Sequence, residues 1–306
     1  MPDYDVVIIG AGPAGLTAGL YLSRGRRRTI VLEKENLGGQ IMNVDWVENY
    51  PGFASGISGA NLGLEMVNQA TKAGIELALD EVVRVELHDG YRIVKCTGGD
   101  YRATIVIIAA GSHPKKLGVP GEETFQRKGV FYCAFCDGSQ FADRVVAVCG
   151  GGDTGVTEAL YMTNLASKII LIEELPVLTC TKVLQERAFA NPKLEIRCGV
   201  KVKAIIGETQ VTTIEVLDTE KRLGEILEVD GVLIHVGIEP NTSYLKDIVP
   251  LDNQGQIVVR DNMETEVPYI LTAGDIRSGS RKQIITAAGD GAIAALSAER
   301  LLQELA

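Results

Sequence analysis

The sequence has few prolines and no extended block of one charge. It contains 10 prolines against 34 glycines, a balance typical of an α/β protein with many tight strand-to-helix turns rather than of a disordered chain. The only basic run is RGRRR at 24–28, and the net charge is −10. Nucleic-acid binding is therefore not expected. We interpret the basic run as the end of a helix, where cations complement the helix dipole.

Long apolar segments are also missing. No run approaches the roughly 18 apolar residues of a membrane-spanning helix. The N-terminal MPDYDVVIIG enters a strand at once and has no basic region typical of a secretory signal. We therefore expect a soluble cytoplasmic protein. Its 306 residues are 46% hydrophobic, which is enough for a sizeable core and for two domains.

Metal-ligand spacing is absent from the histidines and cysteines. His88, His113 and His235 are scattered along the chain. Cys133 and Cys136 form a C-x-x-C motif, but without a second such pair they cannot complete a zinc site. We predict no metal centre. The remaining cysteines are interpreted as structural, and they are Cys96, Cys149, Cys180 and Cys198.

Two stretches share the order strand, glycine-rich turn, helix and strand. In the first, DVVIIG at 5–10 precedes a helical segment and RTIVLEK at 28–34. In the second, RVVAVCG at 144–150 precedes a helical segment and KIILIEE at 168–174. Each is a βαβ unit of the length found in nucleotide-binding folds. The sequence thus predicts an α/β protein with two Rossmann-like, three-layer nucleotide-binding domains, one inserted in the other.

Two short connectors predict where the domains are joined. GSHPKKLGVPG at 111–121 and GIEPNTS at 237–243 are rich in turn-forming residues. We interpret them as two crossings of one boundary. Residues 1–112 and 244–306 would form one discontinuous domain, and residues 113–243, which include the C-x-x-C pair, would form a second domain inserted in it. Two short crossings would let the domains rotate as rigid bodies.

The first glycine-rich turn has the features of a dinucleotide site. Gly10, Gly12 and Gly15 form G-x-G-x-x-G between a strand and a helix, and Glu33 stands at the end of the next strand. The glycines allow a tight turn and close backbone approach, and the helix N-terminus faces a pyrophosphate. Glu33 would accept hydrogen bonds from ribose hydroxyls. We favour this interpretation over a turn that binds nothing.

The segment ILTAGDIRSGSRKQIITAAG at 270–289 adds to this predicted site. Asp275 follows a strand, where its carboxylate would bind a ribityl or ribose hydroxyl. A long Ala- and Leu-rich helix is expected over 283–305, and its N-terminus would stabilise negative charge on a reduced flavin ring. The residues that we predict to contribute are Gly274, Asp275, Lys282, Gln283 and Ile284.

A second G-x-G-x-x-G motif, formed by Gly150, Gly152 and Gly155, follows in the predicted inserted domain. Its strand ends in Glu173 and Glu174, whose carboxylates would repel the 2′-phosphate of NADPH and could accept from the free 2′-hydroxyl of NADH or another adenosine ligand. A solvated acidic strand end is the alternative. The predicted second nucleotide site comprises Gly150, Gly152, Asp153, Thr154, Gly155 and Glu173.

The C-x-x-C pair carries a prediction of redox chemistry. One thiolate would attack a substrate disulfide, and the other would resolve the mixed disulfide. Asp137, directly after Cys136, is placed to protonate the leaving thiolate. Two reduced structural cysteines are the alternative, which we consider weaker because such a pair in a reducing compartment is typically catalytic.

Together these motifs resemble the low-molecular-weight thioredoxin reductase family of flavoproteins. The resemblance covers essentially the whole chain and is carried, in the family's order, by VIIGAGPAGLTAGLY, LEKENLGGQI, VENYPGF, VIIAAGSHPKKLGVPGE, CAFCDG, GGGDTGVTEAL and AGDIRSGSRKQIITAAGDG. It implies a homodimer with FAD in the split domain, and a pyridine nucleotide and the redox disulfide in the inserted domain.

The resemblance also implies residue roles. Cys136 would face the flavin as the charge-transfer thiolate, Cys133 would attack the substrate disulfide, and Asp137 would be the acid. Positions that match FAD-contacting motifs are Glu33, Gly39, Gln40, Asn49, Asp275 and Gln283.

One departure from the family concerns the electron donor. Members that use NADPH carry H-R-R-x-x-x-R after the second nucleotide strand, whereas this chain has Glu173, Glu174, Leu175 and Thr179 there. The stretch LIEELPVLTCTKVLQE is more similar to the NADH-preferring flavoprotein subunit of alkyl hydroperoxide reductase and to atypical reductases that use neither nucleotide well. That subunit's extra thioredoxin-like domain is not found in this sequence, so we expect a separate thioredoxin-like partner.

The sequence therefore predicts an FAD-dependent disulfide oxidoreductase that reduces thioredoxin or a thioredoxin-like protein through Cys133 and Cys136. NADPH is disfavoured and NADH is possible. One alternative is a reductase driven by ferredoxin or a deazaflavin, with an empty or flavin-occupied second nucleotide site. Another is a non-catalytic FAD-binding redox sensor. A flavin reductase of the ferredoxin–NADP type is disfavoured by the cysteine pair.

Overall fold

The chain forms two compact units. The computed structural model describes residues 2–305 except 45, 46, 48, 133 and 246, and the side chains of 135 and 136 also fall outside the description. Unit 1 consists of Met1–His113 and Glu239–Ala306, and unit 2 of Pro114–Ile238. Each unit contains a parallel sheet and helices, so the predicted α/β fold class is confirmed.

Both crossings between the units fall inside the predicted connectors 111–121 and 237–243, although the second lies five residues before the predicted domain bound at 244. The strands β7 (Ser112–Pro114) and β16 (Ile238–Pro240) pair as a two-stranded sheet where the chain crosses. The boundaries fall at 113/114 and 238/239 rather than at 112/113 and 243/244. The residues directly after β16 belong to unit 1 because Asn241 Nδ2 donates to the carbonyl oxygen of Ala110 at 2.7 Å and Thr242 Oγ1 donates to that of Gly255 at 2.9 Å.

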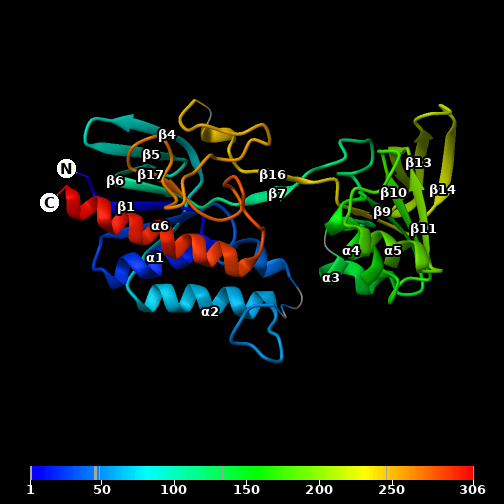
Figure 1. The fold of residues 1–306 in the computed structure, drawn as a ribbon, viewed down its shortest axis with the longest axis horizontal. Coiled ribbons are helices and arrows are strands. Elements are labelled where there is room, and N and C mark those ends of the chain that lie inside the picture. Colours follow the sequence, from blue (N-terminus) through cyan, green and yellow to red (C-terminus); the bar gives the residue numbers. More distant parts are fainter. Residues whose placement is uncertain (1, 45–46, 48, 133, 246, 306) are drawn as a thin grey trace. The chain divides into compact units, whose positions relative to one another are not determined.

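Unit 1 is built on a seven-stranded sheet of order β3-β2-β1-β6-β5-β4, with β17 paired to β6. The strands β3, β2, β1, β6 and β17 run parallel, and β4 and β5 add antiparallel. In Figure 1, the unit's three α-helices lie on one side of β1, and β4 and β5 lie on the other. The bounds are β1 Tyr4–Ile9, α1 Pro13–Arg24, β2 Thr29–Glu33, α2 Gly59–Lys72, β3 Glu76–Leu79, β4 Val82–His88, β5 Tyr91–Cys96, β6 Asp100–Ile108, β17 Ile270–Thr272 and α6 Ile284–Glu304.

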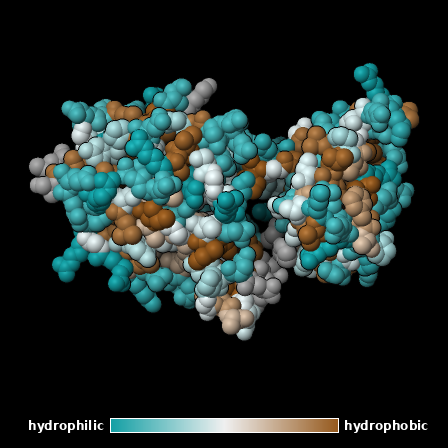
Figure 2. Space-filling view, in the orientation of Figure 1, coloured by the Kyte–Doolittle hydropathy of each residue, from teal (hydrophilic) through white to brown (hydrophobic). Residues whose placement is uncertain are grey.

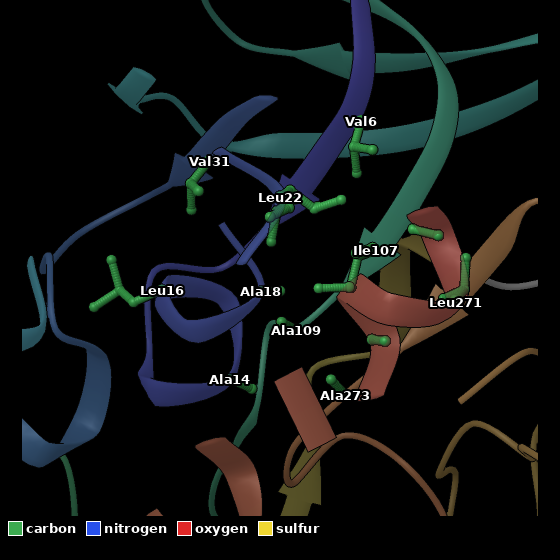
Figure 3. Packing of buried hydrophobic residues seen from close by; sticks show 14 of the residues in the cluster. Val6, Ala14, Leu16, Ala18, Leu22, Val31, Ile107, Ala109, Leu271 and Ala273 are labelled. Atoms are coloured by element: carbon green, nitrogen blue, oxygen red, sulfur yellow. The ribbon is translucent and has the colours of Figure 1, made fainter. Parts of the chain in front are cut away.

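Small residues let α1 and α6 approach each other closely. A Cβ on Gly291 would lie 2.1 Å from the carbonyl oxygen of Ala14, so only glycine fits there. Figure 3 shows Ala14, Ala18 and Leu22 of α1 in one apolar core with the strand residues Val6 and Ile107. This packing fixes where both helices begin, at the same edge of the sheet.

Two ion pairs join α6 to neighbouring segments. The basic run follows α1, which ends at Arg24 as expected, and Arg27 donates to Glu299 of α6 at 2.7 and 2.6 Å. Asp290 is 5% exposed and accepts from Arg277 at 2.6 and 2.8 Å, and from the N–H of Gly274 at 3.1 Å. The second pair therefore holds the loop after β17 against α6.

Unit 2 contains a five-stranded parallel sheet of order β11-β10-β9-β15-β8 and an antiparallel sheet of order β12-β13-β14. Branched apolar side chains make its central strands fully buried, as in a sheet covered on both faces. The bounds are β8 Val130–Phe131, α3 Ala134–Asp137, β9 Val145–Cys149, α4 Asp153–Met162, β10 Lys168–Glu173, α5 Lys182–Ala190, β11 Leu194–Cys198, β12 Val200–Gly207, β13 Val211–Asp218, β14 Gly224–Glu228 and β15 Gly231–Ile234.

The visible surface of each unit mixes hydrophilic residues with smaller hydrophobic patches (Figure 2). On α6, Ile293 and Leu296 are exposed. Across the described part of the chain, every helix is too short or too polar to cross a membrane.

Replacement of Asp290 is expected to destabilise unit 1. Asp290→Ala would leave the largely buried guanidinium of Arg277 without its carboxylate and the N–H of Gly274 without an acceptor, at a cost of about 3 kcal/mol in the free energy of unfolding. Denaturant titration would measure this cost, with the exposed Glu208→Ala as a control. An unfolding free energy unchanged in Asp290→Ala would contradict the proposed importance of this pair.

Candidate functional site

The turn between β1 and α1 leaves no room for side chains at two of its three glycines. A Cβ on Gly10 would lie 2.4 Å from the carbonyl oxygen of Ala109, and one on Gly15 would lie 1.8 Å from the carbonyl oxygen of Gly10. Gly10 also has a φ of +104°, which favours glycine. A Cβ on Gly12, by contrast, would have no heavy atom of the described residues within 4 Å. The turn is thus closed toward the sheet and open at Gly12.

Glu33 at the end of β2 stabilises this turn. Its Oε2 accepts from the N–H of Ala11 at 2.9 Å, and its Oε1 accepts from the N–H of Glu35 at 3.0 Å. The carboxylate therefore keeps a fixed position at the carboxyl end of the parallel strands, where ligands of open α/β sheets bind. The sequence predicted the location of Glu33 but not these backbone contacts.

A cavity of about 1140 Å³ opens beside this turn, and all of its lining residues belong to unit 1. Its volume slightly exceeds the usual range of roughly 300–1,000 Å³ for small-molecule sites, as a dinucleotide requires. It gathers every predicted FAD residue except Gly15 and Asn49. The predicted residues in its lining are Gly10, Gly12, Glu33, Gly39, Gln40, Gly274, Asp275, Lys282, Gln283 and Ile284.

Asp275 provides a buried carboxyl group at this cavity. Burial raises the pKa of Asp275 above its usual value, against the opposing hydrogen bond that Ser280 Oγ donates at 2.9 Å. Hydroxyl donors from a ligand would compensate for the burial of its charge. Beside it, α6 begins at Ile284 with Gln283 as its N-cap, so free backbone N–H groups face the same region.

Two amide side chains connect this region with other segments of unit 1. Asn49 lies outside the cavity lining, yet its Nδ2 donates to Oε1 of Gln283 at 3.0 Å. Gln40 lines the cavity, and its Nε2 donates to the carbonyl oxygen of Ser112. Segments far apart in sequence therefore converge at the start of α6. The open Gly12, the buried carboxyl group and the helix N-terminus fit a flavin dinucleotide.

The glycine turn after β9 repeats the construction in unit 2. A Cβ on Gly150 would lie 2.1 Å from the carbonyl oxygen of His235, and one on Gly155 would lie 2.1 Å from that of Gly150. Gly152 is again open, with Thr179 Oγ1 at 3.7 Å as its nearest neighbour. Glu173 accepts from Gly151 N at 2.5 Å and from Leu175 N at 2.9 Å, as Glu33 does in unit 1.

The residues around this second turn are mostly acidic. Asp153 begins α4, and its Oδ1 accepts from the N–H of Thr181 at 2.7 Å. Glu174 pairs with Lys201 at 2.8 Å, and both side chains are exposed. Thr154 follows Asp153 in the first turn of α4. The structure thus brings the predicted second-site residues together at one sheet edge.

The C-x-x-C motif is only partly described. Cys133 lies outside the described residues, and so does the side chain of Cys136, whose backbone belongs to α3. Asp137 is the last residue of α3. Burial raises the pKa of its carboxyl group, although the charge of Arg127 acts in the opposite direction.

The four remaining thiols have properties expected of structural cysteines. All four are free, and Cys149 and Cys180 are buried. Burial raises the pKa of Cys96 and of Cys149 to about 12, and it also raises the pKa of Cys180 and Cys198. They are therefore protonated and poor nucleophiles at neutral pH. Among the described residues, no cluster of acidic, histidine and cysteine side chains has the arrangement of a metal site.

Sequence reasoning missed two carboxylates beside the cysteine motif. Glu122 is 2% exposed and accepts from the hydroxyl of Tyr132 at 2.7 Å. Glu158 on α4 accepts from the N–H of Ala134 at 2.7 Å. Glu158 lies among small and apolar residues of α4, a signal that marks a buried carboxylate without identifying its partner, whereas Glu122 is followed by Glu123 and carries no such signal.

Comparisons with known proteins agree with this geometry over the full chain. The family described as "Pyridine nucleotide-disulphide oxidoreductase" matches residues 4–291. Thioredoxin reductase of Bacillus subtilis is 42% identical over 303 residues, covering 99% of this chain and 96% of that protein. The structure of Lactococcus lactis thioredoxin reductase has a TM-score of 0.87 at 35% identity and covers 99% of this chain and 100% of its own. That of T. acidophilum thioredoxin reductase has a TM-score of 0.84 at 34% identity and covers 100% of both chains.

These likenesses extend to both units, because the matches cover 99–100% of this chain. The likeness to solved structures confirms the two Rossmann-like domains. The chain belongs to the pyridine nucleotide-disulphide oxidoreductase family and, within it, to the low-molecular-weight thioredoxin reductases.

Proposed function

We propose that the protein is an FAD-dependent enzyme that reduces the disulfide of thioredoxin or a thioredoxin-like protein through Cys133 and Cys136. The observation that carries this proposal is the cavity of unit 1, which gathers residues from the glycine turn, the loop after β17 and the start of α6. Relatives that are named thioredoxin reductase and align over the whole chain support it.

The residues that hold FAD follow from the cavity lining. The turn at Gly12 and the N-terminus of α1 bind the pyrophosphate. Glu33 accepts from a ribose hydroxyl, and Asp275 accepts from a ribityl hydroxyl. Backbone N–H groups at the start of α6 face the ring. When bound, FAD supplies two-electron transfer between a donor and a disulfide.

The cysteine pair then passes these electrons to the partner by thiol–disulfide exchange. The Cys133–Cys136 disulfide takes up two electrons and two protons and becomes two thiols. The Cys133 thiolate attacks one sulfur of the partner disulfide and displaces the other as a thiolate. Cys136 then attacks Cys133, which releases the partner's second sulfur and restores the Cys133–Cys136 disulfide.

Asp137 is the proposed acid in this exchange. Its raised pKa supports the role because a larger fraction of its carboxyl group keeps its proton near neutral pH. That proton passes to the sulfur leaving the partner disulfide. Protonation makes this thiolate a poorer nucleophile and so disfavours the reverse attack.

The electron donor follows from the acidic end of β10. Glu173 stands where Glu33 stands in unit 1, and neither it nor the next six residues carries a positive charge. We therefore propose Gly150, Gly152, Asp153, Thr154, Gly155 and Glu173 as a site for NADH, or for another adenosine ligand without a 2′-phosphate. A donor that acts directly on the flavin, such as ferredoxin or a deazaflavin, is the alternative.

The cellular setting is proposed from the same features. A reactive dithiol requires a reducing compartment, so we place the enzyme in the cytoplasm. A separate thioredoxin-like protein is the partner, and a homodimer is the assembly typical of the family. The inserted unit would rotate between two orientations, because one disulfide must meet both a bound flavin and a protein substrate.

Loss of Cys136 is expected to abolish turnover. In Cys136→Ser, reduction of a thioredoxin disulfide should fall to the rate without enzyme, because no disulfide can accept electrons from the flavin. The matched control is Cys96→Ser, which removes a half-buried thiol at the end of β5 and should retain the wild-type rate. Wild-type turnover in Cys136→Ser would refute the proposed relay, whereas a flavin-loaded wild type without turnover would support the sensor alternative.

The two nicotinamide nucleotides are expected to reduce the bound flavin at different rates. Anaerobic mixing should bleach the flavin absorbance with NADPH at least about tenfold more slowly than with NADH, because the 2′-phosphate meets the Glu173 and Glu174 carboxylates. Glu174→Arg should narrow this difference, and Glu208→Arg, an equal charge change on a distant exposed turn, should not. Equal rates in the wild type would contradict the donor proposal, and bleaching by neither nucleotide would favour a direct donor.

A further inference from the structure

The two residues on either side of Cys133 are each held by a carboxylate with little solvent exposure. The hydroxyl of Tyr132 donates to Glu122 Oε1 at 2.7 Å. The N–H of Ala134, the first residue of α3, donates to Glu158 Oε2 at 2.7 Å. Glu122 lies between β7 and β8, whereas Glu158 belongs to α4. Two separate segments of unit 2 therefore form hydrogen bonds with the residues directly before and after this cysteine.

Glu122 is a fixed anchor. Its side chain also accepts from the N–H of Leu117 at 3.1 Å and from that of Gly118 at 2.7 Å. With three donors on its two oxygens and 2% exposure, the carboxylate cannot turn to follow Tyr132. Burial and the Glu122 charge raise the pKa of Tyr132, so its hydroxyl keeps the proton that it donates.

Glu158 is fixed by a different partner. Its side chain is 13% exposed, and Nε2 of His235, which is 14% exposed, lies 2.7 Å from its Oε2. The imidazole is turned so that this short contact lacks hydrogen-bond geometry, and Nε2 has no other partner among the described residues. The close approach still limits the space in which the Glu158 carboxylate can move. His235 in turn follows β15 and packs against the glycine turn of the second nucleotide site.

We propose that Glu122 and Glu158 are positioning residues that clamp the chain on both sides of Cys133 and so orient its sulfur for thiol–disulfide exchange. This inference rests on the proposed function of the cysteine pair. Glu122 acts through Tyr132, and Glu158 acts through Ala134.

The orientation of Cys133 matters because thiol–disulfide exchange requires the attacking sulfur and the two sulfurs of the substrate disulfide to lie close to one line. A displacement of about 1 Å in the attacking group can lower a rate by up to about a hundredfold. The α3 helix has only four residues and cannot hold its own first turn firmly. Its orientation therefore depends on contacts from outside the helix, and Glu158 supplies one at its first N–H.

The test measures the exchange rate of the FAD-loaded enzyme without a protein partner. The enzyme is reduced with dithiothreitol, freed of it, and mixed anaerobically with 5,5′-dithiobis(2-nitrobenzoate). The protein dithiol is oxidised to the disulfide, and the reagent's disulfide is reduced to two coloured thiolates. The coloured thiolate appears in a rapid initial phase, the burst. The part of this burst that is absent from a Cys133→Ser/Cys136→Ser protein reports the reaction of this cysteine pair alone.

Glu158→Ala is expected to slow the burst about tenfold, and Tyr132→Phe about threefold. Glu158→Gln keeps an oxygen for the N–H of Ala134 and should recover a rate within about twofold of the wild type. Glu208→Gln, an exposed carboxylate between β12 and β13, is the control and should match the wild type. Thermal unfolding and flavin absorbance are followed for each variant, since loss of structure alone would change those readouts as well.

Wild-type burst rates in both Glu158→Ala and Tyr132→Phe would overturn the clamp. A Gln variant as slow as the Ala variant would also overturn it, because the hydrogen bond would then not be the active feature. If Glu158→Ala fails to fold, Tyr132→Phe decides the outcome, since it removes only one hydroxyl. Failure of the proposed function looks different: the wild type would show the burst but would not reduce a thioredoxin.

Discussion

Close backbone contact at two glycine turns is the constraint on which the rest of the structure depends. After β1, Gly10 lies against the carbonyl of Ala109, and after β9, Gly150 lies against the carbonyl of His235. No side chain fits at either contact, so each helix begins directly at the edge of its sheet. A glutamate from the neighbouring strand, Glu33 or Glu173, then accepts a backbone N–H of the turn. Both units thereby present free N–H groups and a fixed carboxylate at the nucleotide sites that we propose.

The same construction serves different purposes in the two units. In unit 1 the close packing of α6 on α1 aligns two helix N-termini beside one cavity, and the Arg277–Asp290 pair holds the loop that contributes Asp275. In unit 2 the helix that starts at the glycine turn is α4. Its first residue, Asp153, belongs to the proposed nucleotide site, and Glu158 contacts the C-x-x-C helix. Helix α4 therefore connects the glycine turn of the proposed nucleotide site with α3, the helix of the C-x-x-C motif.

Much of this arrangement could be predicted from sequence because it depends on local patterns. The glycine spacing, the acid at the end of the next strand and the branched apolar runs predicted both βαβ units, and Glu33 lies where the pattern placed it. The start of α6 and the lining role of Asp275 followed from a similar strand-to-helix pattern.

Other features depend on contacts between distant segments, which no local pattern encodes. The second unit-1 segment was predicted to begin at 244 rather than 239 because Asn241 and Thr242 bond to Ala110 and Gly255 of unit 1, tertiary contacts with no sequence signal. Glu122 and Glu158 were missed because their partners are identified only once the chain folds. His235 was dismissed for lack of ligand spacing, and it lies 2.7 Å from Glu158.

The central claim is that electrons reach the cysteine pair only through a flavin bound in the cavity of unit 1. The most direct measurement compares FAD-loaded and FAD-stripped protein after one equivalent of dithionite under anaerobic conditions. Thiols are then alkylated, and mass spectrometry measures the mass of the tryptic peptide 129–144, which contains both Cys133 and Cys136. We predict two alkyl groups on this peptide in the loaded protein and none in the stripped protein. Equal alkylation in both samples would contradict the account.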